Sequence, residues 1–178
     1  YAVNDSEDDL LHHTWQASRG QLAYITIDMK EGGYAHDVRN DQVADSLVQA
    51  AQHAKCFMVA MQAPCKWHSA LLCLRPGPSM LFDLDHPDGI PNLQPADAKR
   101  QAEALLVYGN CARIADAALQ AKHHLWWEYP AGRGKDSPHA ILGQEKHSTA
   151  FHMSFMKELQ CKHDLQSTTC DQGSRGGG

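Results

Sequence analysis

The residue pattern of this chain predicts an α/β fold built on a Rossmann-like, open and mostly parallel sheet. Apolar segments of strand length alternate along the sequence with amphipathic segments of helix length, which is the pattern of such layered folds. The connections between the strand candidates are long enough for right-handed parallel crossovers. Residues 56–61 are almost wholly apolar, so we expect them to form a central strand that is covered on both faces.

The length and composition of the chain are those of one globular domain. Its 178 residues, 43% hydrophobic and 21% charged, suffice for one buried core. We therefore predict a single domain over residues 1–178, with a flexible acidic start at 1–7 and a glycine-rich tail at 173–178. No apolar run approaches the roughly 18 to 20 residues of a membrane-spanning helix. Because the chain starts at Tyr1 and lacks the layout of a signal peptide, we expect either upstream processing or a piece of a longer chain.

The net charge and the cysteines limit which binding partners and which cellular compartment we expect. The net charge of -5 excludes the broad basic surface of non-specific nucleic-acid binding, so a nucleic acid could be met only through a local patch. The six cysteines contain no CxxC pair, which favours reduced thiols and an intracellular, reducing compartment. These cysteines are Cys56, Cys65, Cys73, Cys111, Cys161 and Cys170.

The first third of the chain predicts a helix, a strand and a second helix. Residues 8–18 place acidic side chains ahead of apolar ones spaced four apart, which is typical of a short helix. Residues 22–28 are rich in β-branched and aromatic side chains and end at Asp28, which predicts a strand. Asn40 or Asp41 then caps a helix. The apolar face of that helix is formed by Val43, Leu47, Ala50 and Ala54.

A long connector and the clearest helix of the chain follow the central strand. The connector runs from Cys65 to about residue 94 and is rich in proline and glycine. Its stretch LFDLDHPDGIP lacks the ligand spacing of an EF-hand loop, so we do not expect calcium there. Pro95 opens a helix over residues 95–121 whose apolar face is lined mostly by alanine. The side chains expected to face water are Lys99, Glu103, Asn110, Arg113 and Gln120.

The last third of the chain predicts a strand, a helix and a short final strand. Residues 123–128 are followed by Pro130, which ends the strand. Residues 148–160 carry the apolar spacing of a helix, and residues 165–170 are a short, polar strand candidate. Among the twelve histidines, His12-His13 and His123-His124 are adjacent pairs and His147 and His152 stand five apart, spacings that do not favour a metal site.

Three polar strand ends follow one another along the chain: Asp28 with Asp37, Pro64-Cys65, and Glu128-Tyr129-Pro130. This order of an acidic strand end, Asp-Val, Pro-Cys and Glu-x-Pro resembles the cytosine-C5 DNA methyltransferases, in particular the compact methylase-like domains of phage and retroelement polyproteins. The stretch HPDGIPNLQPAD at residues 86–97, together with the long helix after it, is similar to the connector of those domains. The resemblance covers about residues 22–173.

The resemblance implies a sheet of the class I methyltransferase type and a role for each of four residues. Asp28 would contact the ribose of S-adenosylmethionine, and Asp37 would lie near its adenine. Cys65 would be the nucleophile that adds to C6 of the target cytosine, and Glu128 the acid that steadies the flipped base. Covalent addition makes C5 nucleophilic, and the base must leave the duplex to reach the thiolate.

The sequence also departs from the family pattern. The glycine-rich first motif and the strand before it are absent, and there is no room for a target-recognition domain. Lys66 stands where glutamine usually follows Pro-Cys, and Tyr129 replaces the asparagine of Glu-Asn-Pro.

Two hypotheses about the function follow. The departures favour a degenerate domain that serves, with other protein chains, as a structural or interaction subunit of a larger assembly. The alternative is an active S-adenosylmethionine-dependent cytosine-C5 methyltransferase.

Each candidate site residue also has a purely structural interpretation. Cys65 could be an inert thiol; Lys66 and His68 could lower its pKa if they lie close, although Lys66 could equally point to water. Glu128 could cap a helix or pair with Arg133, and the two aspartates could be turn formers. A further candidate is a small patch for an anionic ligand, or a solvated loop, formed by Lys66, Arg75, Arg133 and Lys135.

Overall fold

The computed structural model describes residues 19, 27–73, 78–138 and 140–168 of the chain. The chain divides into two compact units, Tyr1–Asp37 and Val38–Gly178. In the first unit, a single helical turn α2 (Met29–Gly32) leads into the 3-10 helix η1 (Gly33–His36). The helix predicted at 8–18 and all but the end of the strand predicted at 22–28 lie outside the described residues.

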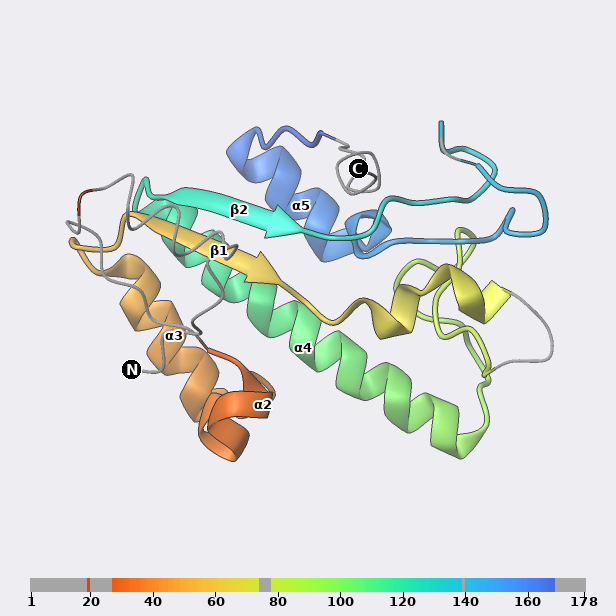
Figure 1. The fold of residues 1–178 in the computed structure, drawn as a ribbon, viewed down its shortest axis with the longest axis horizontal. Coiled ribbons are helices and arrows are strands. Elements are labelled where there is room, and N and C mark those ends of the chain that lie inside the picture. The colour runs from red at the N-terminus through yellow and green to blue at the C-terminus, as the bar shows by residue number, and fades with distance from the viewer. Residues whose placement is uncertain (1–18, 20–26, 74–77, 139, 169–178) are drawn as a thin grey trace. The chain divides into compact units, whose positions relative to one another are not determined.

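The second unit holds the longer helices and the sheet (Figure 1). Asn40 caps its first helix, as predicted, because the Asn40 side chain accepts a hydrogen bond from the Gln42 backbone N–H at 3.0 Å. Its long helix begins at Pro95, whose missing N–H costs nothing in the first turn. The elements in chain order are α3 (Asp41–Gln52), β1 (Met58–Gln62), the 3-10 helices η2 (Cys65–His68) and η3 (Ala70–Cys73), α4 (Pro95–Gln120), β2 (His124–Glu128), the 3-10 helix η4 (Ala150–His152) and α5 (Ser154–His163).

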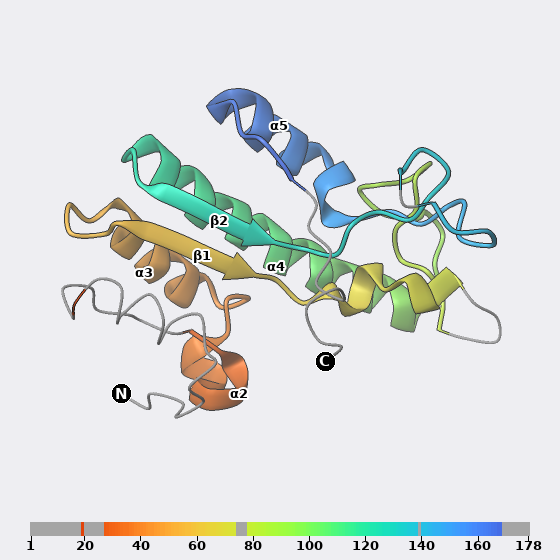
Figure 2. The ribbon, with the colours of Figure 1, turned by 45° about the horizontal axis from the view of Figure 1, so that its top comes forward.

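The two strands form a small, open parallel sheet. Met58 lies opposite His124, and Gln62 lies opposite Glu128, so the strands start and end together. Figure 2 shows α3 and α4 on one side of both strands. The prediction of a mixed fold with parallel strands joined by helices is therefore confirmed. A larger Rossmann-like sheet is not confirmed, because the described residues contain only these two strands.

Two strand predictions need correction. The strand expected at 56–61 is not covered on both faces: Val59 and Met61 pack against the helices, whereas Met58 is 41% exposed. Helices cover one face of this apolar strand, and its other face is exposed. The described residues 165–168 of the strand expected at 165–170 are not in a strand; they follow the left-handed residue Asp164, which ends α5.

The core of the second unit forms around α4. Ala104, Tyr108, Ala115 and Ala118 have no exposed surface, and the small alanine side chains allow neighbouring elements to approach the helix closely. The helix predicted at 148–160 is also present, although η4 and α5 split it at Met153. No helix in the described part of the chain is long and apolar enough to cross a membrane.

One side chain of α4 differs from its prediction. Asn110 was expected to face water but is only 4% exposed. Its amide donates to the Val38 carbonyl at 2.9 Å, and its carbonyl oxygen accepts from Arg113 at 2.9 Å. Arg113 also pairs with Asp45 of α3 at 2.6 Å. Asn110 is buried because it satisfies a backbone carbonyl that no helix or strand bonds.

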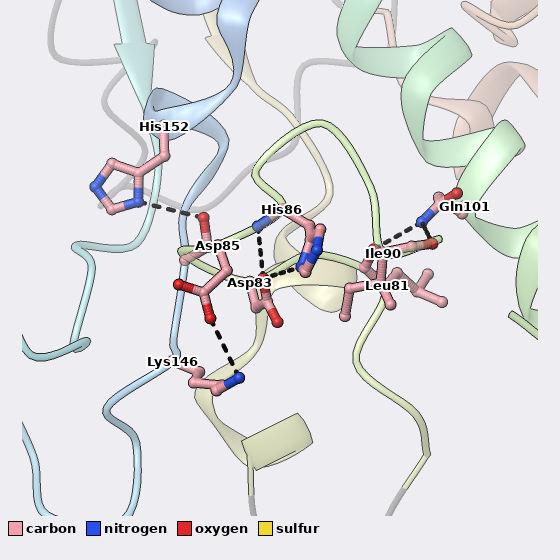
Figure 3. A network of polar contacts seen from close by, with 9 residues as sticks. Leu81, Asp83, Asp85, His86, Ile90, Gln101, Lys146 and His152 are labelled. Carbon is pink, nitrogen blue, oxygen red and sulfur yellow. Dashed lines mark hydrogen bonds and ion pairs between the residues drawn. The ribbon is translucent and has the colours of Figure 1, made fainter. Parts of the chain in front are cut away.

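The connector between η3 and α4 is held in place by polar contacts (Figure 3). The Gln101 amide of α4 donates to the carbonyls of Leu81 and Ile90, at 2.8 and 3.1 Å. Asp83 accepts the backbone N–H of His86 at 2.6 Å, which closes the turn between these two carbonyls. Leu81 has no exposed surface, so this part of the connector belongs to the core rather than to a solvated loop.

Candidate functional site

The parallel register brings Cys65 and Glu128 to the same edge of the sheet. Glu128 is the last residue of β2 and lies opposite Gln62, the last residue of β1. The Gln62 side-chain amide donates to a Glu128 carboxylate oxygen at 3.0 Å. Cys65 follows three residues after Gln62, where it begins η2 as an exposed free thiol. This edge is where ligands bind in open α/β sheets.

The two aspartates assigned to cofactor binding lie in the first unit. Asp28 caps α2, because its carboxylate accepts the Lys30 backbone N–H at 2.7 Å, and it is exposed. Asp37 follows η1 and is only 8% exposed. The turn-forming role that the sequence allowed for Asp28 is therefore present.

A buried polar cluster lies directly beneath the loop that carries Cys65. We call His68, Tyr108, Tyr129 and the Pro64 carbonyl the tyrosine–histidine cluster. The Tyr108 hydroxyl donates to the Pro64 carbonyl at 2.9 Å and lies 2.5 Å from the Tyr129 hydroxyl. His68 Nδ1 lies 3.1 Å from the Tyr108 hydroxyl and 3.0 Å from that of Tyr129. Residues of η2 and α4 and the residue that follows β2 therefore meet here.

The proton positions in this cluster follow from counting donors. Each tyrosine hydroxyl supplies one proton, and the Pro64 carbonyl supplies none. One hydroxyl proton must bond the carbonyl, and the other must lie between the two hydroxyl oxygens, which are too close to face each other without it. Neither tyrosine then has a proton left for His68. His68 must carry its proton on Nδ1 and donate it to the tyrosine oxygens, which leaves Nε2 as a bare acceptor.

The burial of His68 agrees with this arrangement. Its ring is 4% exposed and stacks on Phe82 at a centroid distance of 4.7 Å. Its Nε2 atom is buried and has no hydrogen-bond partner. A bare lone pair costs less there than an N–H donor or a charge. Burial, followed by the nearby rings of His147 and His152, lowers the pKa of His68 to about 3.

The cluster is uncharged as a whole at neutral pH. Burial raises the pKa of both Tyr108 and Tyr129, and the nearby Cys65 raises each of them further. The sequence allowed His68 to act as a cation beside Cys65; with so low a pKa, His68 is neutral and does not supply that charge. The Lys66 ammonium lies over the Trp67 ring, 4.7 Å from its centre.

His147 fixes the other end of the same loop. Its Nε2–H donates to the His68 carbonyl at 2.8 Å, and its Nδ1 accepts the Arg133 backbone N–H at 2.9 Å. Both ring nitrogens are thus satisfied in the neutral form. Burial and the positive charge of Arg133 lower the pKa of His147, against the hydrogen bond to the His68 carbonyl. The close packing continues at Gly134, where a Cβ atom would lie 2.5 Å from the His147 carbonyl oxygen.

The remaining sequence candidates have simpler surroundings. Among the described residues, no group of three or more histidine, cysteine or acidic side chains is placed to hold a metal ion. Arg133 and Lys135 are exposed after β2, whereas Arg75 lies outside the described residues. One feature of the sequence points to the cluster: Tyr108 is the only aromatic side chain in the alanine-rich apolar row of α4.

Comparisons of the chain with known protein families, with curated proteins and with solved structures find no match.

Burial of neutral histidines predicts that the second unit loses stability as pH falls. Below the ordinary histidine pKa of about 6.5, the unfolded chain binds a proton at position 68, whereas the folded chain does so only near pH 3. Within this window His68 alone lowers the free energy of unfolding by up to about 1.4 kcal/mol per pH unit. Urea unfolding at pH 7.5, 6.5, 5.5 and 5.0 measures this slope.

The variant His68→Asn keeps a polar atom near the position of Nδ1 and removes the titration. We expect it to be less stable than the native chain at pH 7.5 but to lose less stability between pH 6.5 and 5.0. His53→Asn, at an exposed position, serves as the control and should keep the native slope. Equal slopes in the native chain and in His68→Asn would contradict the burial of a neutral ring.

Proposed function

We propose that this chain is a structural or interaction subunit of a larger assembly, built on a methylase-like α/β scaffold. The observation that carries this proposal is the uncovered face of the β1–β2 sheet. Parallel strands are almost always covered on both faces, because their crossover connections place helices there. In the described residues of the second unit, α3 and α4 cover one face only.

The other face, which we call the open sheet face, carries large apolar side chains. Trp126 is 53% exposed and Met58 is 41% exposed. The alternation of strand side chains places both on the side away from Val59 and Met61. The face consists of Met58, Ala60, Gln62, His124, Trp126 and Glu128. Exposed tryptophan and methionine are enriched in protein interfaces, and a second chain that covered them would complete the layered sheet.

The edge that would carry catalysis is partly committed to structural contacts. The Glu128 carboxylate accepts the Gln62 amide, and Tyr129 turns into the buried cluster. In the family that the sequence resembles, asparagine occupies the position of Tyr129. The substituted residue thus contributes to internal packing, which supports a scaffold rather than a catalyst.

Photo-crosslinking tests the proposed interaction function. A benzoylphenylalanine residue placed at Trp126 should crosslink to a second polypeptide when the purified chain is added to an extract of the cells that make it. The expected result is one discrete adduct of fixed mass, which unlabelled native chain added in excess competes away. Mass spectrometry identifies the second chain.

The matched control places the same residue at Leu106 of α4, which is 44% exposed and lies outside the open sheet face. It should give no discrete adduct. If both positions crosslink alike, or if position 126 gives none, the open sheet face is not a specific interface and the proposal fails.

A second candidate function is a DNA cytosine-C5 methyltransferase that depends on S-adenosylmethionine. The specific observation in its favour is the shared edge of Cys65 and Glu128, since both residues would have to contact one flipped base. In that reaction the Cys65 thiolate adds to C6 of the cytosine, C5 takes up a methyl group, and loss of the C5 proton releases the thiolate. Glu128 would release its hydrogen bond with Gln62 and contact N3 of the cytosine ring instead.

The residues assigned to the methyl donor fit it unequally. The exposed carboxylate of Asp28 fits contact with ribose hydroxyls, although one of its oxygens already accepts the Lys30 N–H. The burial of Asp37, only 8% exposed, does not fit contact with an adenine ring. The donor would supply the methyl group, but the described side chains do not form a complete site for it.

Covalent trapping separates the two functions. Duplex DNA of mixed sequence, with 5-fluorocytosine in place of cytosine, retains a C5 methyltransferase as a covalent adduct, because fluorine cannot leave as a proton does. With S-adenosylmethionine present, the scaffold proposal predicts no adduct that survives denaturing electrophoresis. An adduct formed by the native chain and by Cys161→Ala, but absent in Cys65→Ala, would instead establish the methyltransferase.

A further inference from the structure

The peptide that precedes Cys65 is anchored by side chains from distant parts of the chain. The Pro64 carbonyl belongs to the peptide group between Pro64 and Cys65, so a hydrogen bond to it fixes the plane of that group. It accepts the Tyr108 hydroxyl at 2.9 Å and lies 3.4 Å from the Tyr129 hydroxyl. Tyr108 comes from α4, and Tyr129 follows the last residue of β2.

The residues that follow Cys65 and Lys66 are anchored as well. Trp67 is 5% exposed and packs edge-on against Tyr108, with ring centroids 5.7 Å apart. The His68 ring donates to the tyrosines, and its carbonyl accepts from His147. Positions 64, 67 and 68 are therefore fixed, while Cys65 and Lys66 between them are exposed. A short exposed segment with both ends held has few conformations open to it.

The electrostatics show what this anchoring cannot do. His68 is neutral, and the pKa of each tyrosine is raised. The cluster therefore neither takes the thiol proton nor presents a positive charge to a thiolate. What it can supply is geometry, and a reacting group gains most from being held in one orientation before its substrate arrives.

We propose that His68, Tyr108 and Tyr129 are positioning residues, which hold the Cys65 thiol in a fixed orientation at the carboxyl edge of the sheet. The claim that this orientation serves a reaction rests on the methyltransferase candidate. The claim that the loop is ordered depends only on the contacts to Pro64. Tyr108 carries most of the effect, because its hydroxyl donates to the carbonyl. Tyr129 contributes by aligning the Tyr108 hydroxyl.

Spin labelling tests the anchoring without requiring any activity. A nitroxide is attached to Cys65 in a chain whose other five cysteines are replaced by alanine. Tyr108→Phe removes the hydroxyl and keeps the ring, so the spectrum should shift toward faster motion at position 65. Tyr129→Phe leaves the Tyr108 bond in place and should give a smaller shift in the same direction.

Cys161, an exposed thiol of α5, provides the control label in the corresponding background. Its spectrum should not change in either variant, whereas general loosening of the fold would shift both labels. Amide hydrogen exchange of the peptide 63–69, measured with all native cysteines present, gives a second readout that does not depend on the cysteine replacements. Faster exchange there in Tyr108→Phe, with peptide 155–162 unchanged, is the expected result.

The outcomes separate this inference from the proposed functions. Unchanged motion and exchange around Cys65 in Tyr108→Phe would overturn the inference, whatever the trapping on 5-fluorocytosine shows. Increased motion at Cys65 together with no trapped adduct would keep the anchored loop and remove the methyltransferase. If both experiments succeed, the trapped fraction should fall in the order native, Tyr129→Phe, Tyr108→Phe.

Discussion

The hydrogen bond from the Tyr108 hydroxyl to the Pro64 carbonyl is the contact on which the carboxyl edge of the sheet depends. It joins the middle of α4 to the chain just after β1, and Tyr129 extends the same network to the chain just after β2. A hydrogen bond in such a part-buried place contributes about 0.5–1.5 kcal/mol to stability. The two tyrosines thereby link the chain segments that follow the two strands.

The burial of the tyrosine–histidine cluster explains why it is neutral. Three polar side chains share a space lined by Trp67, Phe82 and Phe151. A charge in such surroundings would be costly, and burial shifts each pKa toward the neutral form. The network therefore stays in one state across the neutral pH range, which suits the holding of a loop better than the transfer of protons.

The sequence predicted elements well where periodicity was strong and failed where tertiary contacts decided. The alanine-rich face and Pro95 located α4, and Asn40 located the start of α3. The apolar run at 56–61 located β1 but not its open face, because a short apolar run does not distinguish a strand covered on one face from a strand covered on both. Asn110 was assigned to water because an amide is usually exposed. Its burial follows from its hydrogen bond to the Val38 carbonyl, 72 residues away, which no local sequence pattern shows.

The candidate site could be predicted only where local sequence patterns carry it. Pro64-Cys65 and Glu128 follow apolar segments, so their shared edge could be inferred once parallel pairing was assumed. His68 and Tyr108 are separated by 40 residues, and no local pattern links a histidine to a tyrosine so far along the chain. His68 in particular looked like a possible cation, because its burial depends on Phe82 and the tyrosines rather than on its neighbours in sequence.

The position of the His68 proton tests the central contact most directly, and long-range ¹H–¹⁵N correlation spectra of the imidazole measure it. With the two hydroxyl protons used between the tyrosines and the Pro64 carbonyl, the proton must reside on Nδ1 from pH 7.5 down to pH 5. Tyr108→Phe should release this constraint and give a mixture of tautomers. A native ring protonated on Nε2, or on both nitrogens at pH 6, would contradict the network and the anchored loop that depends on it.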